Sequence, residues 1–180
     1  LSKGCMMRRY RALRRIETER LILRPLTTED ADDVFEWVGD PIVNRFMPYN
    51  LYANVEQIKE WIASIDEGHN HFGFELAATG KVIGSGDVSF DPESGAYGLG
   101  YNLNRAFWGQ GFTTEASKAM IQWAYEAVGT RDFVACHAIK NPASGRVMQK
   151  CGFRFERYGQ YSRFDGSETF DAAFYSLHLD

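Results

Sequence analysis

GAYGLGYNLNRAFWGQGFTTEA, residues 95–116, is the stretch of this 180-residue chain that decides the fold. In its first half, large apolar residues alternate with glycine and asparagine, which is the period of two that a β-strand gives its side chains. Its second half favours a helix. Between the halves lie Gly109 and Gly111, which lack Cβ atoms and therefore let the backbone turn tightly and approach a ligand. The stretch predicts a strand, a glycine loop and a helix, in that order.

The glycine loop is a candidate phosphate site. The first four N–H groups of a helix have no partner inside the helix, and the helix dipole adds about half a positive charge at that end, so such a loop can hold a pyrophosphate. The loop lacks the Gly-Lys-Ser/Thr ending of a P-loop, and Thr114 stands where the dinucleotide motif Gly-x-Gly-x-x-Gly needs its last glycine. A single Gly-x-Gly pair is more often a plain strand-to-helix turn, so the loop alone leaves both interpretations open.

A second motif follows an apolar strand at residues 133–139. NPASGRVMQKCGF, residues 141–153, predicts a short helix. Asn141 suits the N-cap, Pro142 suits the first helical position, and Gly152 suits the C-terminal cap.

Together, the Gly-x-Gly loop and the pattern Asn-x-x-Ser-x-x-Val-x-x-Lys-x-Gly-Phe resemble the GNAT superfamily of acyl-CoA-dependent N-acetyltransferases. Within it, the chain is most similar to the ribosomal-protein N-terminal (alanine/serine) acetyltransferases, because ERLILRPL at residues 19–26 and WGQGFTTEA at residues 108–116 match that branch as well. The resemblance covers about residues 17–180. One position departs from the wider family, which begins the loop with Gln or Arg where this chain has Ala106.

The resemblance implies an α/β fold of the GNAT (acyl-CoA N-acyltransferase) type. In that fold a mixed, mostly antiparallel sheet has flanking helices, and its fourth and fifth strands, here residues 97–103 and 133–139, are parallel and splay apart. The residues themselves require that three consecutive strands joined by short turns run antiparallel. Splayed strands leave backbone groups without ladder partners, and the amide chain of pantetheine would pair with them.

Periodicity and cap residues predict the remaining elements. We expect strands at residues 20–26, 72–78, 81–90, 153–164 and 169–179, and helices from the Thr27 cap to Val38, at residues 54–66 and at residues 114–127, with Gly129 as the last cap.

The resemblance implies an acetyl-CoA site on the strand, the loop and the second helix. Backbone groups around Gly100, Tyr101 and Asn102 would pair with pantetheine, and the segment Trp108, Gly109, Gln110, Gly111, Phe112 and Thr113 would hold the pyrophosphate. The Asn141 side chain would bind pantetheine, and Arg146 or Lys150 would reach the 3′-phosphate.

The acceptor site would lie at the segment between the first two helices. In GNAT proteins those helices and their loop form one wall of this site, so Arg45, Phe46, Tyr49 and Tyr52 are expected to shape specificity. For Phe46 alone, core packing is the commoner role.

The chemistry is attack of a neutral amine on a thioester. At pH 7 about one-tenth of α-amines are neutral but only about one lysine in 2,500, so deprotonation costs roughly 1 kcal/mol for an N-terminus and roughly 4 to 5 kcal/mol for lysine. Many relatives place a Glu base where this chain has Gly98. A protein N-terminus is therefore the favoured acceptor, and Asp87, Glu168 or Asp171 could act as base through water.

The departing CoA thiolate needs a hydrogen-bond donor. Many relatives use a Tyr where this chain has Met148, which cannot donate. Ser144 lies one helical turn earlier, and a serine here in the ribosomal branch is thought to interact with the CoA sulfur. Its other possible role is to satisfy the Asn141 cap. Cys136 and Cys151 are expected to be small buried residues rather than nucleophiles, so transfer is expected to be direct.

Composition predicts one domain at residues 17–180, preceded by a basic leader at residues 1–16. The chain is 44% apolar and 14% aromatic, which is enough for a substantial core. Seven basic residues fall in the first twenty positions, which leaves 13 basic and 22 acidic residues in the remainder. A mobile leader is favoured over an RNA- or ribosome-binding arm, and the acidic body favours cationic substrates over DNA.

The remaining signals concern compartment, metals and partners. No run is apolar and long enough to span a bilayer, and no secretory signal opens the chain, so a cytoplasmic protein is expected, as a monomer or homodimer. Three cysteines without Cys-x-x-Cys spacing predict reduced thiols. His69 and His71 lack a third ligand, so no metal is expected. A small-molecule amine acceptor (antibiotic, polyamine or amino acid) and a catalytically silent acyl-CoA-binding module stay as alternatives.

Overall fold

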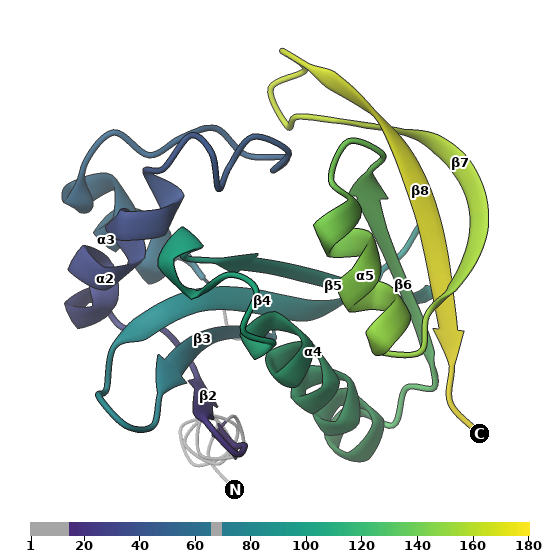
Figure 1. The fold of residues 1–180 in the computed structure, drawn as a ribbon, viewed down its shortest axis with the longest axis horizontal. Helices are drawn as coiled ribbons and strands as arrows, with labels where there is room; N and C mark the ends of the chain where they lie inside the picture. The colour runs from purple at the N-terminus through teal and green to yellow at the C-terminus, as the bar shows by residue number, and fades with distance from the viewer. Residues whose placement is uncertain (1–14, 66–69) are drawn as a thin grey trace, which may run out of the picture.

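The fold is built on one mixed sheet whose strand order is β1-β2-β3-β4-β5-β6-β8-β7 (Figure 1). The computed structural model describes residues 15–65 and 70–180. Within them the strands are β1 Ile16–Glu17, β2 Leu21–Arg24, β3 His71–Leu76, β4 Val82–Asp91, β5 Ala96–Leu103, β6 Asp132–Ala138, β7 Arg154–Ser162 and β8 Thr169–His178. All neighbouring pairs are antiparallel except β5 and β6, which are parallel.

Helices cover both faces of this sheet. They are α2 Ala31–Val38, α3 Val55–Ser64, α4 Phe112–Trp123 and α5 Pro142–Lys150, with 3-10 turns at Thr28–Asp30 and Arg105–Phe107. Val82 packs in a core with α2 and α3, whereas the next residue, Ile83, packs in a second core with α4 and α5. Because successive residues of a strand point to opposite faces, the two helix pairs lie on opposite sides of the sheet.

Local sequence signals fix the helix ends. The Asn54 side chain accepts a hydrogen bond from the Gln57 N–H at 3.0 Å, and Thr27 and Asp30 form a capping box. Gly129 has a φ of 81° at the C-terminal cap, as predicted. Helix α4 begins two residues earlier than predicted and continues into a π-helical turn at Ala124–Val128.

Two sequence features lie largely outside the described residues. The expected leader is described only at its last two positions, and there Ile16 pairs with Leu23 in β1. Of the two loop histidines, only His71 is described, at the start of β3. Among the described residues no helix is long and apolar enough to cross a bilayer.

The parallel pair β5 and β6 separates soon after it forms. The pairs Tyr97↔Phe133 and Gly98↔Val134 join the two strands. On its other edge, β5 stays paired with β4 from Asp91↔Ala96 to Gly84↔Leu103. One edge of β5 is therefore open beyond Gly98, which is the splayed arrangement expected of the GNAT fold, and that fold is confirmed.

Close packing beneath this gap depends on glycine in β4. A Cβ atom on Gly86 would lie 2.6 Å from the Gly100 carbonyl oxygen and 2.8 Å from the Met120 Cε. A Cβ on Gly98, in the neighbouring strand, would meet nothing closer than the Ser89 carbonyl oxygen at 3.7 Å. The two glycines thus differ in whether a side chain can be accommodated.

Gly86→Ala is expected to lower the free energy of unfolding by about 1 to 3 kcal/mol, because a backbone carbonyl cannot move aside as a side-chain tip can. The matched variant Gly98→Ala is expected to stay within about 0.5 kcal/mol of wild type. Urea unfolding of both proteins measures the difference, and equal losses would contradict this account of the packing.

Candidate active site

The gap between β5 and β6 exposes backbone groups of β5. The Asn104 N–H donates to the Ile83 carbonyl of β4 at 2.7 Å. Successive residues of an antiparallel strand turn their backbone groups to alternate edges, so Asn102 and Gly100 also face β4, whereas Tyr101 faces the gap. Of the three positions expected to pair with pantetheine, the geometry therefore favours Tyr101.

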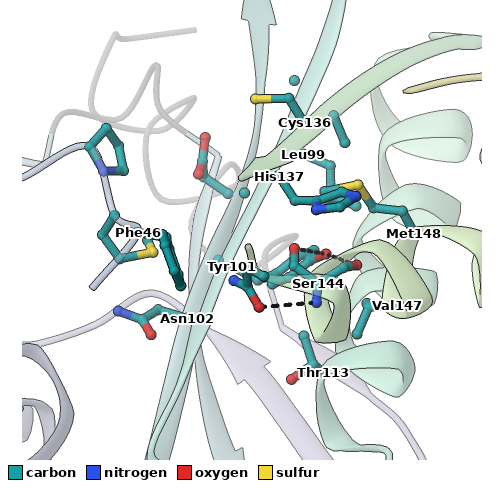
Figure 2. Close-up of a pocket in the computed structure, with 18 of the residues that line it drawn as sticks. Phe46, Leu99, Tyr101, Asn102, Thr113, Cys136, His137, Ser144, Val147 and Met148 are labelled. Carbon is teal, nitrogen blue, oxygen red and sulfur yellow. Dashed lines mark hydrogen bonds between the residues drawn. The ribbon is translucent and has the colours of Figure 1, made fainter. Parts of the chain in front are cut away.

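A cavity of about 2400 Å³ runs through the gap. A typical small-molecule site occupies about 300 to 1,000 Å³, so this one has room for two substrates. Figure 2 shows Phe46 and Ser144 facing it from opposite sides, with Tyr101 and Asn102 contributed by β5. The cavity thus has one wall from the segment after α2 and another from α5.

The glycine loop lies at the N-terminus of α4 and at the edge of this cavity. Gly109 and Gly111 have φ angles of 74° and 85°, which side-chain-bearing residues rarely adopt, and Gly111 is the N-cap of α4. The Trp108 indole N–H donates to the Leu103 carbonyl at 2.8 Å, so the ring ties the loop back to β5. The helix N–H groups behind the loop have no intrahelical partner, which fits a pyrophosphate.

Arg20, which is far from this loop in the sequence, binds it through its side chain. Its Nε atom lies 2.8 Å from the Glu115 carboxylate, its Nη1 atom donates to the Gln110 carbonyl at 2.9 Å, and its guanidinium lies 4.2 Å from the centre of the Phe112 ring. Burial raises the pKa of Glu115, but hydrogen bonds from Thr18 and Arg20 outweigh it and lower the pKa overall. No sequence pattern predicted these contacts of Arg20.

Ser144 and Asn141 lie in the first turn of α5. The Ser144 N–H points at the Asn141 side-chain oxygen, 3.5 Å away, so the cap is made by the backbone of Ser144. The Ser144 hydroxyl instead lies 2.9 Å from the Tyr101 hydroxyl. Met148, one turn later, is buried at 1% exposure. The Ser144 hydroxyl is therefore not consumed by the helix cap.

The expected phosphate-binding cations lie on the same helix. Arg146 and Lys150 are exposed and line the rim of the cavity. Thr113, in the first turn of α4, lines it as well.

The wall formed by the segment after α2, here called the Tyr49 wall, lies opposite α5 and is held by hydrogen bonds among two asparagine amides and a tyrosine hydroxyl. The Asn102 side-chain nitrogen donates to the Tyr49 hydroxyl at 2.6 Å and to the Asn44 side-chain oxygen at 3.1 Å. Asn44, at 2% exposure, donates in turn to the Trp37 carbonyl at the end of α2. Burial raises the pKa of Tyr49, so its hydroxyl stays protonated. Asn44 has no sequence signal beyond its place after the helix.

Aromatic rings extend this wall. Tyr49, Tyr52, Trp61 and His71 follow one another with ring centres 6.4, 5.9 and 5.3 Å apart, and all four line the cavity.

The β7–β8 hairpin bends toward the segment between α2 and α3 (Figure 1) and binds its backbone. The Arg163 guanidinium donates to the carbonyls of Met47 and Tyr49 at 3.0 Å and to that of Arg45 at 3.2 Å. The Tyr161 hydroxyl donates to the Phe46 carbonyl at 2.6 Å. Three of the four expected specificity residues, Arg45, Phe46 and Tyr49, are thus held by a hairpin more than 110 residues away.

The three candidate bases lie in different surroundings. Asp87 lines the cavity, on β4 opposite Gly100. Glu168 contacts Arg45 at 2.9 Å and Arg163 at 3.3 Å. Burial raises its pKa, but these two hydrogen bonds lower it overall. Asp171 accepts a hydrogen bond from Gln160 at 2.9 Å, and neither it nor Glu168 lines the cavity.

Residues 20–154 match the family model for the acetyltransferase (GNAT) domain. The uncharacterised N-acetyltransferase p20 of Bacillus licheniformis is 32% identical over 145 residues, which cover 77% of this chain and 82% of that protein.

Solved structures share the fold. The chain is similar to the ribosomal-protein-S5-alanine acetyltransferase from Vibrio fischeri, with a TM-score of 0.73, 20% identity and coverage of 92% and 97% of the two chains. It is also similar to the microcin C7 self-immunity acetyltransferase MccE, solved with acetyl-CoA and AMP, with a TM-score of 0.77, 19% identity and coverage of 90% and 94%. The family match and the splayed site lead to one conclusion: this chain belongs to the GNAT acetyltransferase family.

Proposed function

We propose that this enzyme transfers an acetyl group from acetyl-CoA to the α-amine of a protein N-terminus. Membership of the GNAT family supports acetyl transfer as the reaction. The acceptor class rests on one residue: Gly98 stands at the position where the resemblance implies a glutamate base in many relatives. A ribosomal-protein N-terminus is the specific acceptor that we favour.

Acetyl-CoA fits the residues of the gap. The thioester that it supplies is the electrophile of the reaction. Backbone groups of Tyr101 and the side chain of Asn141 suit pantetheine, the loop around Gly109 and Gly111 suits the pyrophosphate, and Arg146 or Lys150 suits the 3′-phosphate. Gly111 supports this assignment because its positive φ and missing side chain open the α4 N-terminus to a ligand.

Direct attack by the amine is favoured over an acyl-enzyme. Burial raises the pKa of Cys136, and it raises the pKa of Cys151 to about 11. Both side chains are therefore thiols near neutral pH, whereas the nucleophilic form of cysteine is the thiolate.

Amine deprotonation separates the acceptor classes. An α-amine loses its proton near pH 8, so a weak base or water suffices, whereas an ε-amine needs a strong base near its pKa of about 10.4. Asp87 is the candidate base that lines the cavity. It suits an α-amine best, because about one-tenth of α-amines are already neutral at pH 7, so a base acting through water is enough.

A small-molecule amine is the second candidate acceptor. The row of rings from Tyr49 to His71 offers an apolar recess beside the gap, which suits a compact aromatic or alkyl amine.

The cellular setting is part of the proposal. We take residues 17–180 as one catalytic domain, working in the cytoplasm as a monomer or homodimer. The two described cysteines are unpaired, which suits a reducing compartment.

An acceptor panel tests the proposed reaction. Peptides with a free N-terminus are expected to release CoA thiol faster than the same peptides with a blocked N-terminus and one lysine, by about tenfold or more. The rate with the free peptide should rise with pH up to about pH 8, because the neutral amine is the nucleophile and its fraction increases until its pKa is passed. Faster turnover of the blocked lysine peptide or of small amines would reject the N-terminal acceptor.

Gly111→Val is expected to weaken acetyl-CoA binding by tenfold or more, about 1.4 kcal/mol. A side chain at this positive φ would distort the loop whose N–H groups would hold the phosphates, and its Cβ would lie 3.5 Å from the Arg20 guanidinium. Gly129→Val is the matched control, since Gly129 has a φ of 81° and caps the other end of the same helical segment. Calorimetry should give a normal Kd for Gly129→Val at comparable loss of thermal stability. If the two variants bound acetyl-CoA with equal affinity, the loop would not be part of the binding site.

Gly98→Glu is expected to extend activity to lysine amines. Its side chain would share a face with Asn102, toward the Tyr49 wall, and has room because no atom lies within 3.7 Å of the added Cβ. A positioned base contributes about 10² or more in rate, so kcat/KM for the blocked lysine peptide should rise by about that factor. Gly98→Gln, which has the same shape without the base, should show no gain, and a similar gain in both variants would contradict the argument.

A further inference from the structure

The hydroxyls of Tyr101 and Ser144 meet inside the gap, from opposite sides. Tyr101 projects from β5 and Ser144 from the first turn of α5, and their oxygens are 2.9 Å apart (Figure 2). The Tyr101 hydroxyl also lies 3.0 Å from the Ser144 backbone carbonyl. Both residues line the cavity.

The number of protons limits how this pair can bond. A phenol carries one proton, and so does a serine hydroxyl. When the Tyr101 hydroxyl donates to the Ser144 carbonyl, the Ser144 hydroxyl can donate its own proton to the Tyr101 oxygen. When Tyr101 donates to the Ser144 hydroxyl oxygen, the serine proton must point elsewhere, and the cavity is the open direction. The two arrangements differ only by rotation of two hydroxyls.

We propose that Tyr101 is a positioning residue that directs the Ser144 proton at the sulfur of the departing CoA thiolate. The inference rests on the proposed function and adds to it a residue on β5. As the amine nitrogen bonds to the acyl carbon, the carbon–sulfur bond breaks and its electron pair stays on sulfur. Ser144 donates a hydrogen bond to that sulfur without losing its proton, and the proton released by the amine goes to the base or to water.

The surroundings of Tyr101 suit this role. Burial raises the pKa of Tyr101 well above its usual range, and the hydrogen bond with Ser144 opposes this only in part. Tyr101 therefore remains a donor at any working pH. Hydrogen bonds to a charged group are stronger than those between neutral groups, so a developing thiolate selects the arrangement in which Ser144 faces it. Met148, on α5, has no hydroxyl at the position where the family resemblance implies a tyrosine donor in many relatives.

A purely structural role for Tyr101 would be to pin α5 against β5. Such a role predicts weaker CoA binding in Tyr101→Phe and no change in the chemistry of the bound thiol. The thiol pKa of bound CoA therefore separates the two roles, because a hydrogen bond to the charged form lowers a pKa.

The experiment titrates CoA bound to purified protein by ultraviolet absorption of the thiolate. A matched complex with desulfo-CoA is subtracted to remove the signals of tyrosine and cysteine. Wild type, Tyr101→Phe, Ser144→Ala and the double variant are compared with Tyr175→Phe. Tyr175 is a suitable control because it is a buried tyrosine of β8 that lines the same cavity. Calorimetry gives the Kd for CoA, and thermal melting shows that each variant is folded.

Wild type is expected to hold the bound thiol at a lower pKa than free CoA. Tyr101→Phe should raise that pKa by about one unit, a tenfold weaker preference for the thiolate, while Tyr175→Phe leaves it unchanged. Ser144→Ala should give a similar rise, and the double variant should add little, because the two hydroxyls act as one unit.

Two results would overturn the inference. One is an unchanged thiol pKa in Tyr101→Phe with CoA still bound, which assigns Tyr101 a structural role only. The other is additive effects of the two single variants, which makes the hydroxyls independent. If wild type failed to bind CoA at all, the proposed function itself would fall, so the two failures can be told apart.

Discussion

The structure depends on a pair of parallel strands that stop pairing halfway along. β5 and β6 are joined at Tyr97↔Phe133 and Gly98↔Val134 and then separate. A separated strand edge carries N–H and C=O groups that are costly to bury unpaired. Those groups must face either water or a ligand that has amides of its own. The same gap lets α5 approach β5 closely enough for Ser144 to contact Tyr101.

Each wall of the gap is held by polar contacts between distant segments. Arg20 clamps the glycine loop through Glu115, Asn102 fixes the Tyr49 wall, and Arg163 binds the backbone of the same wall from the β7–β8 hairpin. These contacts are hydrogen bonds that involve charged or amide groups and are partly buried, and such bonds have strict geometry. These contacts therefore hold the walls of the gap in place although no continuous ladder of backbone hydrogen bonds joins β5 to β6.

The acid–base character of the site follows from burial. Tyr49, Tyr101, Cys136 and Cys151 all have raised pKa values because burial disfavours their charged forms. Of these four, Tyr49, Tyr101 and Cys136 line the cavity, so it is lined by neutral hydroxyls and a neutral thiol. Glu168, whose pKa the two arginines lower, is held in the hairpin contact rather than in the cavity. Such surroundings suit stabilisation of a departing thiolate more than removal of a proton from a strongly basic amine.

The sequence by itself determined the order of the helices and of the strands after β1, which was not predicted. It also determined the caps at Thr27, Asn141 and Gly129, and the glycine loop at the start of α4. These features depend on residues within a few positions of one another, so alternation, cap chemistry and glycine spacing predict them. The tertiary structure decided that Asp87 rather than Glu168 or Asp171 lines the cavity, and that the Ser144 hydroxyl bonds to Tyr101 rather than to its own helix. It alone revealed Arg20, Asn44 and Arg163, whose contacts join residues 58 to 118 positions apart. No local pattern records such contacts, because they exist only once separate elements have packed together.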